Sequence, residues 1–534
     1  MGLIETVLDH LTVKSVALLV VGFLVVKFLV NRLIEHVRLR RLPGGRARKV
    51  PSWAPFGLDL VKGAVESTLA QNNLDYWRNV YFKDGTRWTG EVRVLNQRIV
   101  MTADPENIKA ILALQFSDFG KGEPFHDEWK DFLGDSIFTT DGPQWHASRQ
   151  LIRPQFTKDR VSDLECFESH MQTLFRAMDN LGPLDGEHQK VTPGNAHGKV
   201  QDISELFFRY TLDVTTEFLL GKDTKSLCSI RNDFADSFNE VQRMQNIIVR
   251  ASKARRWIPK SSFWNGLDLC NKFINFYIDR VLKLSPAELE SHNKGERGYT
   301  FVHALAGFTR DPKVLRDQII AVLLAGRDTT ASTLSWTLYE LSRTPHAVAK
   351  LRQEILSTVG RDRTPTYEHL KNMPYLKAIL NEILRLYPSV PFNVRLALKD
   401  CTLPTGGGPD GTDPIAVLKN TPIGYSTLVM QRRAELYPPV SDKFADPEVF
   451  SPERWSVWHP KPHDYIPFNA GPRICIGQQF ALTEMSYVLV RMFQKYDRVE
   501  SHMGPVDGGK PMLKADIVLS PGQGVKVAFF EAQD

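Results

Sequence analysis

The segment FNAGPRICIG, from Phe468 to Gly477, restricts the fold of this chain more than any other. Its cysteine, Cys475, directly precedes residues 476–496, in which apolar side chains recur at steps of three and four. That spacing predicts an amphipathic helix. Because the dipole and free N–H groups of a helix N-terminus lower the pKa of a thiol, we expect Cys475 to be a metal ligand or a nucleophile. An unreactive, buried cysteine is the ordinary alternative.

The neighbours of Cys475 suit a flat, bulky bound group. Gly471 and Gly477 allow the backbone to approach such a group closely, and Phe468 can shield the sulfur. Arg473 can pair with a carboxylate on the bound group. The other cysteines, at positions 166, 228, 270 and 401, are widely spaced and form no CxxC pair, so neither a disulfide framework nor a zinc site is indicated.

An apolar stretch near the N-terminus predicts a membrane anchor. Residues 16–26 are apolar without interruption, and FLV extends them beyond Lys27, which gives about the 20 residues that a marginal membrane span needs. Basic residues follow between positions 32 and 49, whereas Glu5 and Asp9 precede the span. By the positive-inside rule, the rest of the chain stays in the cytosol. The charge order and the lack of a cleavage site disfavour the alternative, a secretory signal peptide.

We therefore expect an anchor over 1–34, a basic linker with prolines and glycines over 35–55, and a single domain over 56–534. In that domain, apolar periodicity predicts helices over 161–181, 200–220, 313–343, 346–359, 373–386 and 476–496. Short strands are expected over 89–95, 98–102 and 526–530, and the glycines at 406–408 predict a hairpin turn. The predicted fold class is mainly α with small β-sheets.

The net charge of +6 favours a membrane surface or an acidic protein partner. It includes no long Lys/Arg blocks interleaved with aromatic residues, so no nucleic acid partner is predicted.

The pattern FxxGxRxCxG resembles the haem-ligand signature of the cytochrome P450 superfamily. The resemblance implies the cytochrome P450 fold, with 56–534 as a single haem-thiolate catalytic domain behind a transmembrane helix. It also implies haem b (iron protoporphyrin IX) as the cofactor and Cys475 as the axial ligand of its iron. Glu382 and Arg385, in ExxR spacing, and Arg454, in PERW, match the structural triad of the family.

Other matches occur in the family's order. In AVLLAGRDTTAS, residues 321–332, Gly326 and the adjacent threonines weaken a helix, which suggests a site. The resemblance implies that this helix loosens over the haem, that Thr329 hydrogen-bonds the activated oxygen and that Asp328 relays protons. Trp145 and Arg149, in WxxxR spacing, and Arg395 are expected to contact haem propionates.

Segments such as AGRDTTA, TLPTGGGPDG and PFGLDL resemble the fungal, membrane-anchored P450s that hydroxylate n-alkanes and fatty acids. The implied activity is a monooxygenase that inserts one oxygen atom of O2 into a C–H bond of a hydrophobic substrate, at the chain terminus. Alternatives are a hydroxylase of a sterol or secondary metabolite, a reductase-independent isomerase or lyase, and a haem sensor. The last two have little use for the acid and alcohol at 328 and 329.

No flavin or dinucleotide fingerprint is present, so electrons must come from another protein. The resemblance implies NADPH-cytochrome P450 reductase, with cytochrome b5 as a second donor, at the endoplasmic reticulum membrane. Substrate is expected between the helix of Thr329, the loop 116–138 and the segment 389–394. The apolar candidates there are Val390, Phe392 and Val394, for which ordinary core packing is the alternative.

Overall fold

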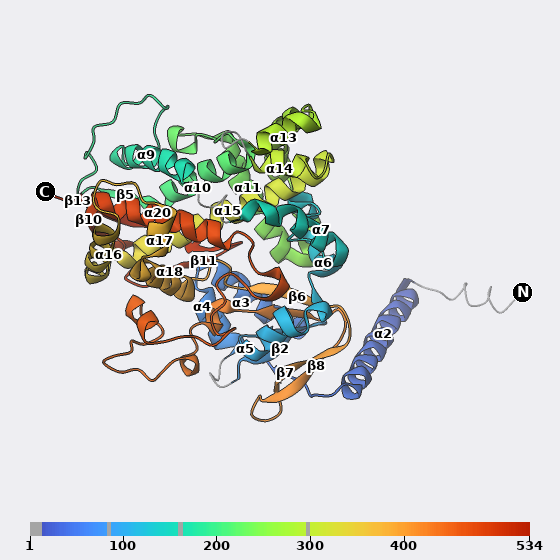
Figure 1. The fold of residues 1–534 in the computed structure, drawn as a ribbon. Coiled ribbons are helices and arrows are strands. Elements are labelled where there is room, and N and C mark those ends of the chain that lie inside the picture. The colour runs from blue at the N-terminus through green and yellow to red at the C-terminus, as the bar shows by residue number, and fades with distance from the viewer. Residues whose placement is uncertain (1–12, 83–86, 158–163, 295–299, 534) are drawn as a thin grey trace, which may run out of the picture.

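A computed structural model describes residues 13–82, 87–157, 164–294 and 300–533. Helices make up 57% of the chain and small sheets lie beside them, which confirms the predicted fold class. The helices gather in one part of the molecule and most strands in the other (Figure 1).

Six long helices lie close to the predicted ranges. They are α9 (Glu165–Asp179), α10 (Ile203–Leu220), α15 (Pro312–Leu341), α16 (Pro345–Thr358), α18 (Pro374–Leu386) and α20 (Gln478–Lys495). Two further long helices, α11 (Asp233–Ala251) and α12 (Ser261–Leu282), were not predicted. Residues 161–163 of the first predicted helix lie outside the described residues. The helix predicted from position 200 begins at Ile203, because Val200–Asp202 forms strand β5 and Asp202 then caps the helix by accepting from the Ser204 N–H at 3.1 Å.

The longest helix, α15, is buried on nearly all sides, as expected for a helix through the middle of a domain. Figure 1 shows it among α10, α11 and α20. Asp311 caps its N-terminus by accepting from the N–H groups of Lys313 at 2.8 Å and Val314 at 3.3 Å, and Pro312 occupies the first turn. This helix is the element that connects the core to the candidate site.

The largest sheet has six strands in the order β1-β2-β3-β9-β6-β4. Its strands are β1 (Arg48–Lys49), β2 (Thr89–Val94), β3 (Gln97–Thr102), β4 (Phe119–Gly120), β6 (Asn393–Ala397) and β9 (Pro422–Tyr425). The glycines at 406–408 lie where β7 (Cys401–Gly407) turns toward β8 (Asp413–Val417), so the predicted hairpin is confirmed. The predicted C-terminal strand is β13 (Lys526–Glu531), which pairs with β5 and with β10 (Tyr496–Ser501).

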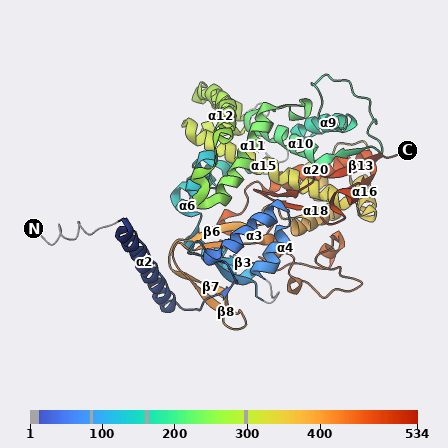
Figure 2. The same ribbon diagram turned by 180° about the vertical axis from the view of Figure 1, so that it is seen from behind.

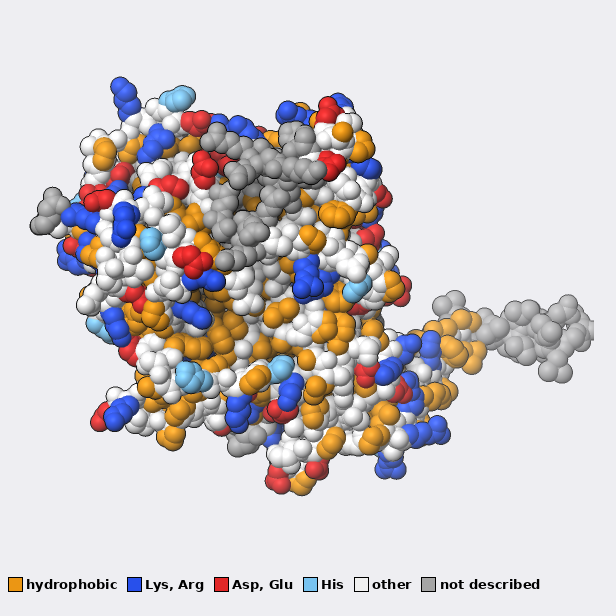
Figure 3. Space-filling view, viewed as in Figure 1, with side chains coloured by type: hydrophobic (Ala, Val, Ile, Leu, Met, Phe, Trp, Pro, Cys, Tyr) orange, Lys and Arg blue, Asp and Glu red, His pale blue; other side chains and the backbone are white. Residues whose placement is uncertain are grey.

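The apolar N-terminal segment forms α2 (Val13–Arg41), which is long and apolar enough to cross a membrane. Hydrophobic side chains cover it, and basic side chains gather toward its domain end (Figure 3). The helix continues beyond residue 34, where we expected the anchor to end, and residues 1–12 lie outside the described part of the chain.

The segment expected to be a linker is docked on the domain. Leu39 is only 5% exposed and packs with Ala416 and Leu418, beside the β7–β8 hairpin (Figures 1 and 2). Arg38 Nη2 lies 2.6 Å from Asp400 Oδ1, and Glu35 accepts a hydrogen bond from Arg93 of β2. The C-terminal end of α2 and the residues after it, to position 50, are therefore docked on the domain and do not act as a free tether.

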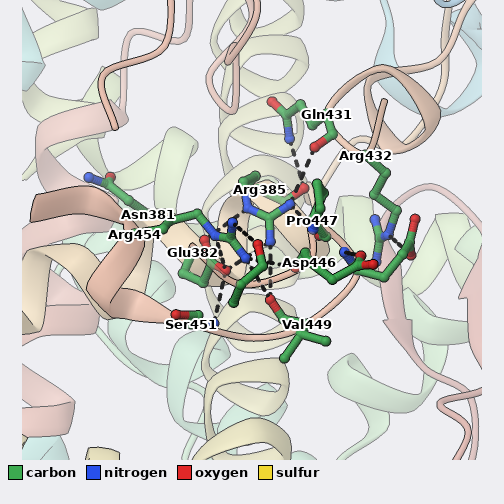
Figure 4. Close-up of polar contacts among 12 residues, drawn as sticks. Asn381, Glu382, Arg385, Gln431, Arg432, Asp446, Pro447, Val449, Ser451 and Arg454 are labelled. Carbon is green, nitrogen blue, oxygen red and sulfur yellow. Dashed lines mark hydrogen bonds and ion pairs between the residues drawn. The ribbon is translucent and has the colours of Figure 1, made fainter. Parts of the chain in front are cut away.

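A fully buried carboxylate, that of Glu382, holds α18 to the segment 446–454 (Figure 4). Its Oε1 accepts from Arg385 Nη2 at 2.8 Å and Arg454 Nε at 2.9 Å, and its Oε2 accepts from Arg385 Nε at 2.8 Å. The Ser451 N–H and the Trp455 indole complete its shell, each at 3.0 Å. Burial alone would raise the pKa of Glu382, but the two guanidinium groups lower it below the ordinary value.

The docked linker predicts where the chain can be shortened. Deleting residues 1–42 retains Gly45, whose N–H donates to the Pro414 carbonyl and whose carbonyl accepts from the Ala416 N–H, both at 2.9 Å. Deleting residues 1–50 leaves both partners without a hydrogen bond, at about 1–3 kcal/mol for each buried group. We expect the protein that lacks residues 1–50 to have a lower free energy of unfolding than the one that lacks residues 1–42, measured by denaturant titration of the purified haem proteins. Equal stabilities would contradict the docking.

The shell of Glu382 gives a second prediction. Glu382→Gln leaves two buried guanidinium groups without a counter-charge, so we expect a loss of about 3–5 kcal/mol in unfolding free energy. Glu453→Gln, in the same PERW motif but with a side chain that is 42% exposed and paired to Lys350, is the control and should cost about 0–1 kcal/mol. Denaturant titration would measure both, and equal losses would refute a special role for Glu382.

Candidate active site

Cys475 lies in the loop that precedes α20. Its N–H donates to the Phe468 carbonyl at 2.9 Å, which closes the loop, and the helix begins at Gln478. The residue is exposed, yet the surrounding protein desolvates its sulfur. That burial raises the pKa of the thiol, while the Gly477 N–H and Arg149 act in the opposite direction. For the thiol alone, burial outweighs the backbone amide.

A cavity of about 940 Å³ opens beside the cysteine loop. Its walls include Trp145, Arg149 and Cys475, which brings three predicted residues together. Trp145 and Arg149 come from α7 (Gly142–Ile152), and Arg149 Nη1 donates to the Ile474 carbonyl at 3.1 Å. Phe116 packs on the Trp145 ring, with centroids 5.5 Å apart.

The two glycines of the loop differ in how much space surrounds their Cα atoms. Gly471 has φ +67°, and a Cβ there would lie 1.8 Å from the Leu112 carbonyl oxygen. Its need for glycine therefore comes from the neighbouring backbone, which corrects the expectation of close approach to a bound group. At Gly477, a Cβ would meet nothing nearer than Phe156 at 3.8 Å. The space beside Gly477 is thus open.

Cationic side chains gather next to the cavity. Arg473 donates to the Thr140 carbonyl at 2.8 Å and pairs with Asp141, and its guanidinium lies 4.7 Å from the centre of the Trp145 ring. Burial, together with the nearby Arg395, lowers the pKa of Arg473 to about 10. Arg395, only 3% exposed, donates to the Val394 carbonyl at 2.9 Å.

Lys121 also belongs to this group and was missed by sequence reasoning. Its Nζ donates to Asn393 Oδ1 at 3.0 Å, and Arg395 Nη1 donates to the same oxygen at 3.1 Å. Burial and the like charges of Arg395 and Arg473 hold the pKa of Lys121 well below its ordinary value. Nothing in FGKGEPF marks this lysine, because its neighbours come from distant strands.

These features fit the haem that the sequence resemblance implies. Cys475 lines a cavity with largely apolar walls, and the buried cation Arg473 contacts Trp145 in one of these walls. Arg473 Nε is buried without a hydrogen-bond partner in the described structure. A flat, apolar group that carries carboxylates would satisfy all of these groups.

The middle of α15 presents one stripe that is less buried than the rest. Val322, Ala325 and Thr329, at steps of three and four, are partly exposed, whereas their neighbours Leu323, Leu324 and Thr330 are buried. Because α15 is enclosed by the domain, this stripe faces an internal space. The Thr329 hydroxyl donates to the Ala325 carbonyl at 2.7 Å.

Two expectations about α15 need correction. The helix shows no break from Pro312 to Leu341, so the predicted loosening is not seen. A Cβ at Gly326 would lie 3.1 Å from the Thr215 side chain, so this glycine allows α10 to pack closely on α15. Helix packing therefore explains the residue that the sequence suggested as a sign of a site.

Asp328 does not share the stripe of Thr329. It is 2% exposed, its Oδ1 lies 3.3 Å from Arg327 Nη1, and that oxygen has no hydrogen bond among the described residues. Burial raises its pKa, although Arg327 and the Gln242 amide lower it in part. The predicted acid and alcohol are thus adjacent in sequence but point to different sides of the helix.

The residues that we expected to contact substrate have different surroundings. The Phe392 ring packs on Trp77, with centroids 5.5 Å apart, and fills the space above Gly424, so core packing accounts for it. Val390 is 40% exposed and Val394 is partly exposed. The loop 116–138 contains a further helix, α6 (Gly122–Leu133).

Comparisons with known proteins agree with this site. The family model described as Cytochrome P450 matches residues 72–525. The chain is 59% identical over 502 residues to Cytochrome P450 monooxygenase pvhE of Talaromyces variabilis, which covers 94% of this chain and 93% of that protein. It is 40% identical over 496 residues to Cytochrome P450 52A1 of Candida tropicalis, with 89% and 86% covered.

Among solved structures, the haem domain of cytochrome P450DA matches with a TM-score of 0.72 at 18% identity, over 92% of this chain and 98% of that one. At that identity the likeness concerns the fold, which is the predicted one. The family match over residues 72–525 and the relatives at 59% and 40% identity establish that this chain belongs to the cytochrome P450 family and is a haem-dependent monooxygenase.

Proposed function

We propose that this monooxygenase hydroxylates the terminal carbon of n-alkanes or fatty acids at the endoplasmic reticulum membrane. Its family implies a redox partner, a hydrophobic substrate and O2. We assign haem b as the cofactor and NADPH-cytochrome P450 reductase as the electron donor, with cytochrome b5 as a second donor.

The observation that carries the proposal is the inner stripe of α15. Val322 and Ala325 are apolar, and Thr329 contributes a single hydroxyl, so the internal space beside them suits an apolar chain with little polar content.

The apolar N-terminal helix supports the same substrate class. A chain anchored through α2 draws its substrates from the bilayer, where alkanes and fatty acids dissolve. The motifs that resemble fungal alkane and fatty-acid hydroxylases point in the same direction. A secondary metabolite or sterol is the second candidate, because the relative at 59% identity, monooxygenase pvhE, is not one of the 52A proteins.

The residues of the candidate site would have different roles in such a reaction. Haem held through the Cys475 thiolate would supply the activation of dioxygen. Arg473, Arg395 and Trp145 would orient its carboxylates. Arg149 donates to the Ile474 carbonyl next to the sulfur. Thr329 Oγ1 can turn its hydrogen bond from the Ala325 carbonyl into the internal space, and Asp328, whose pKa burial raises, can hold a proton at Oδ1.

Thr329 offers a direct test of proton delivery. Thr329→Ala removes the hydroxyl from the internal stripe, so we expect substrate binding to persist while NADPH oxidation yields more hydrogen peroxide and less product. Thr330→Ala is the matched control, because Thr330 is 1% exposed and lies outside the stripe. Peroxide and product would be quantified per NADPH consumed. Unchanged coupling in Thr329→Ala would remove this residue from the mechanism.

The substrate is tested by reconstitution of the full chain with reductase and NADPH. We expect saturated chains of about 12–18 carbons, comparable to a bilayer leaflet, to give ω-hydroxy products in mass spectrometry. The reduced carbon monoxide spectrum is recorded first, and Cys475→His should abolish its long-wavelength Soret band. Oxidation of a sterol or aromatic compound, with no turnover of any alkane or fatty acid, would refute the substrate class but leave the monooxygenase intact.

A further inference from the structure

Two neighbouring helices bring a cysteine, a histidine and a glutamate together. Cys166 and His170 lie one turn apart on α9, and Asp213 and Glu217 lie one turn apart on α10, so each pair shares a face of its helix. Figures 1 and 2 show α9 beside α10, far from the anchor helix α2. One ligand-type atom from each of Cys166, His170 and Glu217 lies within 4.8 Å of the other two. Cysteine spacing does not reveal this cluster, because its members come from two helices.

His170 is the residue that the surrounding acidic groups share. Its side chain is only 5% exposed, and its Nε2 lies 2.7 Å from Glu217 Oε2, a hydrogen bond that needs one shared proton. A ring nitrogen of His170 and carboxylate oxygens of Asp213 and Asp223 form a second group within 4.8 Å. The Leu227 N–H donates to Asp213 Oδ2 at 2.9 Å, which fixes that carboxylate in the interior.

The cluster carries an excess of negative charge. Asp213, Glu217 and Asp223 place three carboxylates around one imidazole, and the exposed Lys222 offsets only part of their charge. Burial lowers the pKa of His170, but the hydrogen bond to Glu217 and the charges of the three carboxylates raise it overall. The surroundings therefore favour a cation at the position of the imidazole proton.

A buried hydroxyl near the cluster has no acceptor. Tyr210 lies on α10, three residues before Asp213, and is fully buried. Its hydroxyl has no hydrogen-bond partner among the described residues. Burial, followed by the charges of Glu484 and Cys166, raises the pKa of Tyr210, so its phenol lies close enough to Cys166 for the two to interact. A thiolate at Cys166 would provide an acceptor for this hydroxyl.

We propose that Cys166, His170 and Glu217 form a zinc site that joins α9 to α10. A thiolate, an imidazole and a carboxylate are ligands of Zn²⁺, whereas Ca²⁺ and Mg²⁺ bind through oxygen. Tetrahedral zinc, with bonds of about 2.0–2.3 Å, needs ligand atoms about 3.3–3.6 Å apart, which small side-chain rotations provide within this cluster. Zinc replaces the proton between His170 and Glu217 and the thiol proton of Cys166, both protons pass to solvent, and water fills the fourth position.

Such a site would stabilise the helices that pack on the cysteine side of the domain. Phe167, next to Cys166, packs on Phe480 of α20 with ring centroids 5.4 Å apart. Because the folded protein would bind zinc and the unfolded chain would lack the assembled site, zinc should raise the unfolding temperature. The inference depends on neither the haem nor the proposed substrate.

The test measures zinc binding by the untagged, full-length haem protein. In equilibrium dialysis against ZnCl₂, we expect one zinc per chain in wild type and an affinity at least about tenfold lower in Cys166→Ser and Glu217→Gln. Cys401→Ser and Glu205→Gln are the matched controls, because Cys401 is a partly exposed cysteine of β7 and Glu205 is an exposed glutamate of α10 that pairs with Arg209. Both controls should bind zinc as tightly as wild type.

X-ray absorption at the zinc edge identifies the ligands in wild type, even if a variant does not fold. We expect one sulfur at about 2.3 Å and nitrogen or oxygen ligands at about 2.0–2.2 Å. Zinc should also raise the unfolding temperature of wild type but not of Cys166→Ser. Less than one zinc per chain, a zinc shell without sulfur, or equal affinity in Cys166→Ser would each overturn the proposal. Because no measurement involves turnover, such a failure leaves the proposed hydroxylation untouched.

Discussion

The buried carboxylate of Glu382 is the interaction on which the cysteine side of the molecule depends. It holds α18 to the segment 445–455 through two guanidinium groups, and Arg385 reaches further to the Pro447 carbonyl at 2.7 Å. The carbonyls of Leu384 and Arg385 accept from Gln431 Nε2, whose Oε1 accepts from the Ile466 N–H at 3.0 Å. That bond lies just before Phe468, so the cysteine loop is supported from α18 by a continuous hydrogen-bonded path.

Charge is distributed unequally around the site. The Glu382 carboxylate forms ion pairs with two arginines, so its charge is fully compensated, as expected for a group that stabilises the fold. The group of Lys121, Arg395 and Arg473 has only Asp141 as its ion-pair partner within the described residues, which is the arrangement of a binding site for an anion. The number of counter-charges therefore distinguishes the cations that stabilise the fold from those that can bind an anion.

The fold and much of the site could be predicted from local pattern. Helices such as α16 and α18 appear within a residue or two of their predicted ends, because apolar periodicity and proline at the first turn are local properties. The contact of Glu382 with Arg454 was predicted from the ExxR and PERW motifs and their order along the chain. Lys121 and Asp141 could not be found, because their partners belong to β6 and the cysteine loop, hundreds of residues away.

The sequence by itself determined the family, the cysteine at the site and the apolar anchor, since each depends on residue types at short spacing. Tertiary structure decided which residues face the internal space: Thr329 does and Asp328 does not, although they are neighbours, because the surroundings of α15 differ on its two sides. The tertiary structure also shows why two glycines are needed. The Leu112 carbonyl lies against Gly471, and α10 packs against Gly326. A glycine in a sequence shows that space is scarce, but only the packed neighbour shows what takes up that space.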